Sequence, residues 1–155
     1  MANTQSMCTS FMGELMTATH NFTTGTGNTF KAALYFASAT LNASTTVYST
    51  TNEVTNTSGT GYTAGGVTVT NGTSPTATNS STTAGVAYWT PTGNFSWTAL
   101  TVNTAFDCVL VYNSSASNKA VSVHTFGSQT ITAGTFTLTM PSNTTSTALL
   151  RLSTT

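Results

Sequence analysis

Acidic side chains are the first candidates for chemistry, and the chain has only three of them: Glu14, Glu53 and Asp107. Glycoside hydrolysis and most sites for hard metal ions require two or more converging carboxylates, or carboxylates together with histidines. Glu14 falls on a predicted helix and the other two fall on separate predicted strands, so the spacing does not bring them together. Asp107 beside an apolar strand could be a buried acid, but a strand-entry residue bonded to the backbone is the stronger interpretation.

The histidines and cysteines are just as scattered along the chain. His20 is expected to close the predicted helix, where a cationic side chain complements the helix dipole, and His124 is expected to end a strand. Neither histidine has a Cys, His or Asp at metal-ligand spacing. Cys8 and Cys108 are predicted to be reduced and buried, because the first residues lack the pattern of a signal peptide and a reducing compartment keeps thiols unpaired. A Cys8–His nucleophile pair has no supporting local signature.

Aromatic residues are the remaining candidates for binding a ligand. Trp89 and Trp97 could form a platform on which a sugar ring stacks, and Tyr88 and Phe95 would extend it. Such residues more often belong to the core, which is the interpretation we favour. The alternating threonines at 135–139 are only weakly similar to an ice-binding surface, because their spacing is irregular. The sequence therefore predicts no catalytic residue, no cofactor and no metal site.

Composition favours β structure and an uncharged surface. Charged residues make up 4% of the 155-residue chain and the formal net charge is zero, whereas charged residues are usually about a quarter of a protein. Threonine, which is β-branched and suits a pleated sheet, supplies about one residue in four. Hydrophobic residues make up 38% of the chain, which is enough to form a core. A surface with so few charges resists self-association poorly, as suits a subunit that functions in an assembly.

The distribution of charge also excludes two classes of partner. Nucleic-acid binding requires clustered cations, but Lys31, Lys119 and Arg151 are far apart in the sequence. No apolar run approaches the length of about 20 residues that spans a bilayer. We therefore expect neither a nucleic-acid partner nor insertion into a membrane.

Helical spacing is confined to residues 10–20, where apolar residues recur four positions apart. Thr9 or Ser10 can cap this helix and Asn21 offers a stop. Such a short helix would be marginal alone, so it should dock on the β domain or, as the alternative, on a neighbouring subunit.

From residue 29 onward the apolar period changes to two, which predicts a series of short strands. Turn-forming residues are expected to separate them, and 75–83 is expected to be an exposed loop. The strongest local prediction is a hairpin that pairs 108–112 with 120–123. The predicted strands are 29–36, 46–54, 61–70, 84–89, 95–102, 106–112, 120–126, 135–140 and 148–152, with turns at 58–61, 71–72, 91–93, 113–115 and 133–134.

These elements predict an all-β fold of one ordinary domain. Short strands at intervals of about 8–12 residues are typical of a sandwich or a barrel. We expect an antiparallel β-sandwich of Ig-like or jelly-roll type at 29–155, preceded by an N-terminal arm at 1–28 that carries the short helix.

Ten short segments of the chain have a distinctive order and spacing. They are Phe11, Glu14-Leu15, His20–Phe22, Phe30–Tyr35, Thr51–Val54, Gly59–Gly66, Val111–Ser115, Asn118–Val121, Thr135–Pro141 and Ala148–Leu152. In this order and spacing the chain resembles a widespread family of small structural proteins of tailed bacteriophages. The resemblance covers nearly the whole chain and includes no catalytic motif. Between residues 73 and 97 the chain departs from the family pattern, because it is almost all Thr, Ser and Asn where more acidic or apolar character is expected.

The resemblance implies a non-enzymatic virion protein. The role that it favours is a capsid decoration, or cement, protein that stabilises the outer shell through multivalent packing. The alternative is a tail or head-fibre component that adheres to glycans or to the host surface. The expected partners are the major capsid protein or other virion subunits. A homo-oligomer, with a trimer favoured, is expected on the particle, after synthesis in the host cytoplasm.

Overall fold

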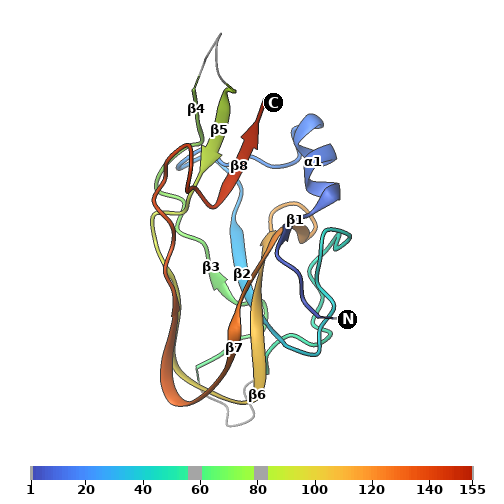
Figure 1. Cartoon of the computed structure of the whole chain (residues 1–155), viewed down its shortest axis with the longest axis vertical. Helices are drawn as coiled ribbons and strands as arrows, with labels where there is room; N and C mark the ends of the chain where they lie inside the picture. The colour runs from blue at the N-terminus through green and yellow to red at the C-terminus, as the bar shows by residue number, and fades with distance from the viewer. Residues whose placement is uncertain (1, 56–60, 79–83, 155) are drawn as a thin grey trace.

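The computed structural model describes residues 2–55, 61–78 and 84–154. The expected all-β sandwich with a short helix is confirmed: the strands form two antiparallel sheets, in the orders β1-β7-β6-β2-β3 and β4-β5-β8 (Figure 1). The elements are β1 (Ser6–Met7), α1 (Thr9–Met16), β2 (Phe30–Phe36), β3 (Val67–Thr68), β4 (Thr76–Ala77), β5 (Val86–Trp89), β6 (Phe95–Asn113), β7 (Lys119–Leu138) and β8 (Leu150–Ser153).

One long hairpin, β6–β7, supplies most of the architecture. The apolar run that starts at Cys108 pairs as expected, with Leu110 opposite Val123 and Val111 opposite Ser122. Both of these cross-strand pairs are buried, and consecutive residues from Cys108 to Tyr112 are buried as well. Because successive side chains point to opposite faces of a sheet, this part of β6 is covered on both faces. The predicted hairpin and its turn after Asn113 are confirmed.

The two strands of this hairpin are much longer than the sequence predicts. The segments predicted as separate strands, 95–102 with 106–112 and 120–126 with 135–140, are continuous in β6 and β7. The predicted turn at 133–134 is wrong, since it lies inside β7, where Ala133 has a φ of 46°. The pairing register also shifts several times along the hairpin. Bulges of this kind bend strands, and the hairpin curls back on itself at its far end (Figure 1).

The curled hairpin and β2 enclose an aromatic core. Trp97 and Phe136 stack with ring centroids 5.9 Å apart, and Phe106 meets Phe136 edge-on at 5.2 Å. At the other end of the core, Phe22 stacks on Phe30 at 4.2 Å. Because Phe22 precedes β2, residues before the predicted boundary at 28 contribute to this core; the division into arm and domain stays a prediction.

Two predicted strands are largely absent, and glycine geometry explains one of them. Segment 46–54 forms only isolated bridges, at Val47 and Glu53, and in segment 61–70 the strand is limited to Val67–Thr68. Gly66 has a φ of +71°, and a Cβ there would lie 1.9 Å from the Ala32 carbonyl oxygen. Only glycine fits such a close approach. The positive φ of Gly66 interrupts the extended backbone that a longer strand would need.

The other local predictions vary in outcome. Residues 71–72 lie between β3 and β4 without forming a hairpin, whereas 91–93 connect β5 to β6 as expected. The predicted exposed loop at 75–83 contains the exposed strand β4. The predicted turn at 58–61 and the predicted loop at 75–83 both include residues outside the described part of the chain, namely 58–60 and 79–83.

Helix α1 is shorter than predicted and docks on the sheet. It begins after Cys8, which gives no side-chain cap, so the predicted caps at Thr9 and Ser10 are wrong. It ends at Met16 rather than near Asn21, because Ala18 turns into the left-handed region with a φ of 56°. Phe11 is buried in the core, which confirms docking on the β domain. Within the described residues no helix has the length and hydrophobicity to cross a membrane.

Candidate functional site

Glu14 lies at the centre of a polar network that joins α1 to the β6–β7 turn. Its Oε1 accepts a hydrogen bond from Lys119 Nζ at 2.5 Å and its Oε2 lies 2.8 Å from His20 Nε2. Burial would raise the pKa of Glu14, but the hydrogen bonds from Lys119 and His20 and the charge of Lys119 outweigh it and lower that pKa. The network therefore holds the carboxylate ionised. His20 is buried against the sheet, so the prediction that it closes the helix is wrong.

The hydrogen bonds around His20 select one tautomer. Asn113 Oδ1 accepts from the Ser115 N–H at 3.1 Å, so its Nδ2 faces His20 Nδ1 at 3.0 Å and Asn28 Oδ1 at 2.9 Å. With an amide donor on Nδ1, the ring carries its proton on Nε2 and donates it to Glu14. His20 thus serves as a structural bridge between Asn113 and Glu14.

Glu53 is held in a different way, by neutral donors alone. Its Oε2 accepts from Tyr48 Oη at 2.6 Å, and its Oε1 accepts from Tyr62 Oη and from the Gly65 N–H, both at 2.7 Å. The residue is 3% exposed. Burial, together with the Glu53 charge, raises the pKa of both hydroxyls and raises that of Tyr112 to about 12. We call Glu53, Tyr48, Tyr62, Gly65 and Tyr112 the Glu53 cluster.

The Glu53 cluster is a polar feature that the sequence does not predict. Tyr112 Oη donates to the Gly65 carbonyl at 2.8 Å and its ring stacks on Tyr48 at 4.5 Å. The cluster therefore fixes the irregular segments 47–54 and 61–66 against β6. No local pattern signals this, because the partners come from three separate segments.

Asp107 and His124 also lie elsewhere than predicted. Asp107 is inside β6, and its Oδ1 accepts from Asn3 Nδ2 at 2.6 Å, so the predicted strand-entry bond to backbone is wrong. His124 lies within β7 rather than at its end, and its Nε2 is 2.9 Å from Ser122 Oγ. The spacing of Ser122 and His124, two residues apart on a strand, could have predicted that they share a face.

The Ser122–His124 pair lacks the properties of a catalytic dyad. Burial lowers the pKa of His124 to about 4, which makes the imidazole a weak base at neutral pH. Ser122, which would have to act as the nucleophile, is 1% exposed. Among the described residues no carboxylate bonds to His124, and no three His, Cys, Asp or Glu side chains are placed to hold a metal ion.

Burial of the cysteines is confirmed, and neither of them forms a disulfide. Cys8 and Cys108 are both free and buried. Burial first, and then the nearby charge of Glu14, raises the pKa of Cys8 to about 11. Burial and the charge of Asp107 raise the pKa of Cys108 to about 12. Both thiols are therefore poor nucleophiles at neutral pH.

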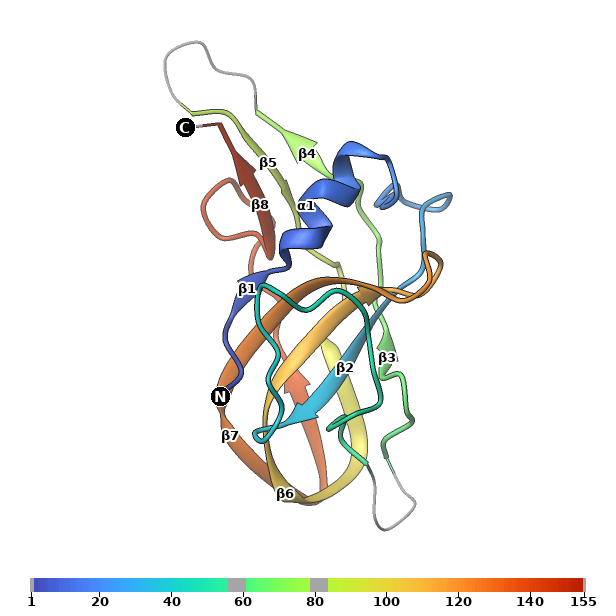
Figure 2. The ribbon, with the colours of Figure 1, turned by 90° about the vertical axis from the view of Figure 1, so that its right-hand side faces the viewer.

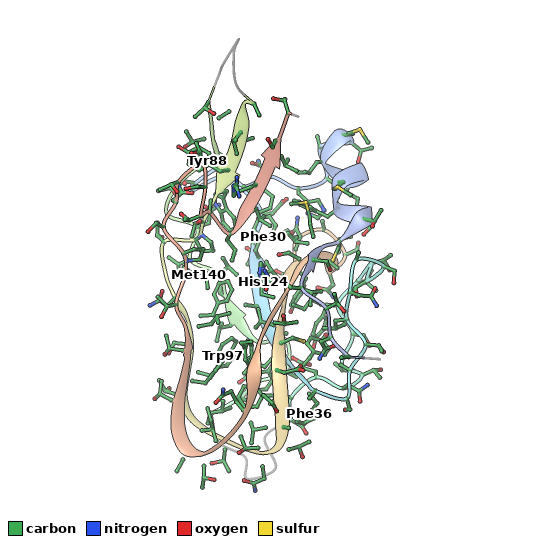
Figure 3. All side chains as sticks on the ribbon, viewed as in Figure 1. Phe30, Phe36, Tyr88, Trp97, His124 and Met140 are labelled. Atoms are coloured by element: carbon green, nitrogen blue, oxygen red, sulfur yellow. The ribbon has the colours of Figure 1, made fainter. Side chains whose placement is uncertain are left out.

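The tryptophans belong to the core, as favoured, and form no stacking platform. Trp89 and Trp97 are each 2% exposed, and Phe95 is buried with them. Trp89 Nε1 donates to Asn71 Oδ1 and the Thr73 carbonyl, both at 3.0 Å. Figure 3 labels Trp97 inside the sandwich and Tyr88 near its upper end. A sugar ring cannot reach either indole in this arrangement.

Two hollows on the surface of the molecule border β8. An apolar hollow of about 110 Å³ has Phe11, Leu15 and Leu152 in its lining. Its lining residues come mainly from α1 and the β4-β5-β8 sheet, whose ribbons lie side by side in Figure 2. A polar hollow of about 330 Å³ lies between β1, β7 and β8. The two hollows share Met7 and Leu150. We call the two together the β8 groove.

The two ends of the β8 groove differ in chemistry. The apolar end is bordered by side chains from α1, β5 and β8. The polar end is lined by Gln5, Ser6, Ser122, His124 and Arg151, among others.

The side chains that line these two hollows can make binding contacts. Aliphatic and aromatic side chains at one end offer apolar contact, and Arg151 at the other offers a charged hydrogen-bond donor. No family model, no curated protein and no solved structure matches the chain. The residues themselves therefore carry the functional argument.

Proposed function

We propose that this chain is a non-enzymatic structural subunit of a bacteriophage particle, and that it acts as a capsid decoration (cement) protein. The observation that carries the proposal is the β8 groove, together with the sparse charge around it. All three carboxylates of the chain are engaged within the fold, by Lys119 and His20, by tyrosine hydroxyls, or by Asn3. What remains for a partner is a surface with few charges, which includes Arg151 and an apolar recess.

Exposed apolar side chains on two elements that border the groove, α1 and β8, support protein–protein docking. Met16 and Met12 on α1 are 87% and 45% exposed, and Leu152 on β8 is 41% exposed. Fully burying one such side chain contributes about 1.5–3 kcal/mol. Contacts of this size become stable when one subunit touches several neighbours at once, which is how a cement protein would act.

The test is the stability of particles that lack the protein. Such particles should assemble but release their DNA at a lower temperature, and purified protein should restore the release temperature by mass action. A Met16→Ser variant should restore it at a higher concentration than the wild type. Thr137→Ser, on an exposed part of β7, is the matched control.

One outcome would replace this proposal. If deficient particles release DNA at the wild-type temperature but fail to adsorb to host cells, the protein is a tail or head-fibre adhesion component and not a cement protein.

A further inference from the structure

Strand β8 has a free edge. It is the last strand of the β4-β5-β8 sheet. The Thr78 N–H donates to the Val86 carbonyl on the β4 side, so the next residue, Ala87, turns its backbone groups toward its partner Leu152. Alternation in an antiparallel pair then leaves the N–H and C=O groups of Arg151 and Ser153 on the outer edge. Unpaired groups of this kind form a template for another strand.

The polar hollow lies beside this edge. The apolar hollow lies over the face of the sheet that Leu152 shares with its partner Ala87, so the two hollows differ in what they can accept. Leu150 and Leu152 border the apolar hollow of about 110 Å³. Arg151 borders the polar hollow with Ser122 and His124. An extended segment beside β8 would therefore meet backbone groups, an apolar recess and a cation within one short strand.

Arg151 is a cation without an anionic partner in the described part of the chain. Within that part Glu14 forms an ion pair with Lys119 and a hydrogen bond with His20, and Arg151 takes part in no salt bridge. The chain has only three carboxylate side chains among 155 residues, so few internal anions compete with a partner for Arg151. Arginine forms strong, bidentate hydrogen bonds with carboxylates, so the edge favours an incoming acidic side chain.

A second copy of this chain does not satisfy that preference. Pairing β8 with β8 of another copy would bring two arginines together, and like charges opposite each other destabilise a sheet. Glu14, Glu53 and Asp107 are each held by internal hydrogen bonds, so another copy has no side-chain carboxylate to spare. The occupant must come from a different protein.

We propose that the free edge of β8 receives an extended segment of a partner protein as an added strand, with a carboxylate side chain beside Arg151 and an apolar side chain in the α1–β8 hollow. The mode of binding is β-augmentation, in which main-chain hydrogen bonds supply affinity and side-chain recesses supply specificity. The proposed function enters this inference at one point only: it identifies the partner protein as another subunit of the particle.

Defined peptides test the edge directly. The probes are ten-residue peptides of alternating Thr and Val with a central Glu, Gln or Lys, and a fourth peptide in which alternate amides of the Glu peptide are N-methylated. Binding to the full chain is measured by titration calorimetry, and protection of the Arg151 and Ser153 amides by hydrogen exchange. The variant is Arg151→Gln, and the matched control is Lys31→Gln, which removes the cation of β2.

The Glu peptide should bind about two- to fivefold more tightly than the Gln peptide, as an opposite-charge cross-strand pair implies, and the Lys peptide should bind least. Arg151→Gln should abolish the preference while Lys31→Gln retains it. N-methylation should abolish binding. Absence of binding by any peptide, equal binding of all three, or binding that survives N-methylation would overturn the inference.

The same variant separates this inference from the proposed function. If the peptides bind as expected but added protein never stabilises deficient particles, the cement role fails and the edge-binding inference stands. If Arg151→Gln protein stabilises particles as well as the wild type and no peptide binds, the inference fails and the cement role stands.

Discussion

Glu14 and Glu53 are two partly or fully buried carboxylates that the same fold accommodates by opposite means. Glu14 is bonded to Lys119 and His20, and its side chain is 15% exposed. Glu53 is 3% exposed and receives only tyrosine hydroxyls and a backbone amide. The first joins a helix to a hairpin turn, and the second joins two irregular segments to β6.

The contrast shows how a chain with few cations can bury a negative charge. A buried charge is costly unless charge pairing or hydrogen bonding compensates it. With two lysines and one arginine available, the fold uses one lysine for Glu14 and relies on neutral donors for Glu53. The deeper carboxylate should therefore depend on geometry and the shallower one on charge, which leads to four predictions.

The largest effect is expected from Glu53→Ala. It removes the acceptor for two hydroxyls and one amide, and each buried donor left without a partner costs about 1–3 kcal/mol. The free energy of unfolding should fall by about 3 kcal/mol or more in urea denaturation. Met16→Ala, at an exposed position, is the control and should change little. A loss below about 1 kcal/mol would show that water or rearranged tyrosines replace the carboxylate easily.

The second-largest effect is expected at high pH, which should destabilise the Glu53 cluster. The pKa of Tyr112 is raised from 10.0 to about 12, and those of Tyr35, Tyr48 and Tyr62 are also raised. Folding thus disfavours tyrosinate, so the stability from these groups is complete below pH 10 and is lost as the pH rises toward 12. Tyrosinate absorbance and unfolding should rise together above pH 10. Separate transitions, with ionisation in the folded state, would contradict this coupling.

Glu14→Gln should cost less, about 1 kcal/mol, because Lys119 is 36% exposed and exposed ion pairs are weak. Its pH dependence has the opposite sign to that of the tyrosines. Because folding lowers the pKa of Glu14, this carboxylate stabilises the protein at pH values above its pKa in the unfolded chain. That stabilisation is lost as the pH falls through the pKa of Glu14 in the folded protein. The difference in urea midpoint between wild type and Glu14→Gln should shrink below pH 4 and in high salt. A constant difference would show that the charge is irrelevant.

Sequence reasoning predicted the parts of this molecule whose signals are local. The hairpin around 113–119 and strand β2 follow from alternating or continuous apolar runs and turn residues. The contact between Glu14 and Lys119 joins residues 105 positions apart, and no periodicity marks it. Tyr48 and Tyr62 lie in segments without regular structure, so their convergence on Glu53 depends on tertiary packing. The bend in β6–β7 was missed for a related reason: bulges at Ala99 and Ala133 keep paired strands continuous where turns were expected.

The smallest predicted effect uses Cys8 to report the charge of Glu14. Burial is the main reason that the pKa of Cys8 is raised to about 11, and Glu14 adds to it. Removing that charge in Glu14→Gln should lower the pKa of Cys8 slightly and raise its rate of alkylation at pH 8–9, because the thiolate is the reactive species. Cys108, whose neighbouring charge is Asp107, should alkylate at an unchanged rate and so provides an internal control. Peptide mass spectrometry after timed iodoacetamide treatment separates the two sites. If both thiols accelerate equally, the substitution has loosened the fold rather than removed a charge, and Glu14 would then resemble Glu53 in acting mainly through geometry.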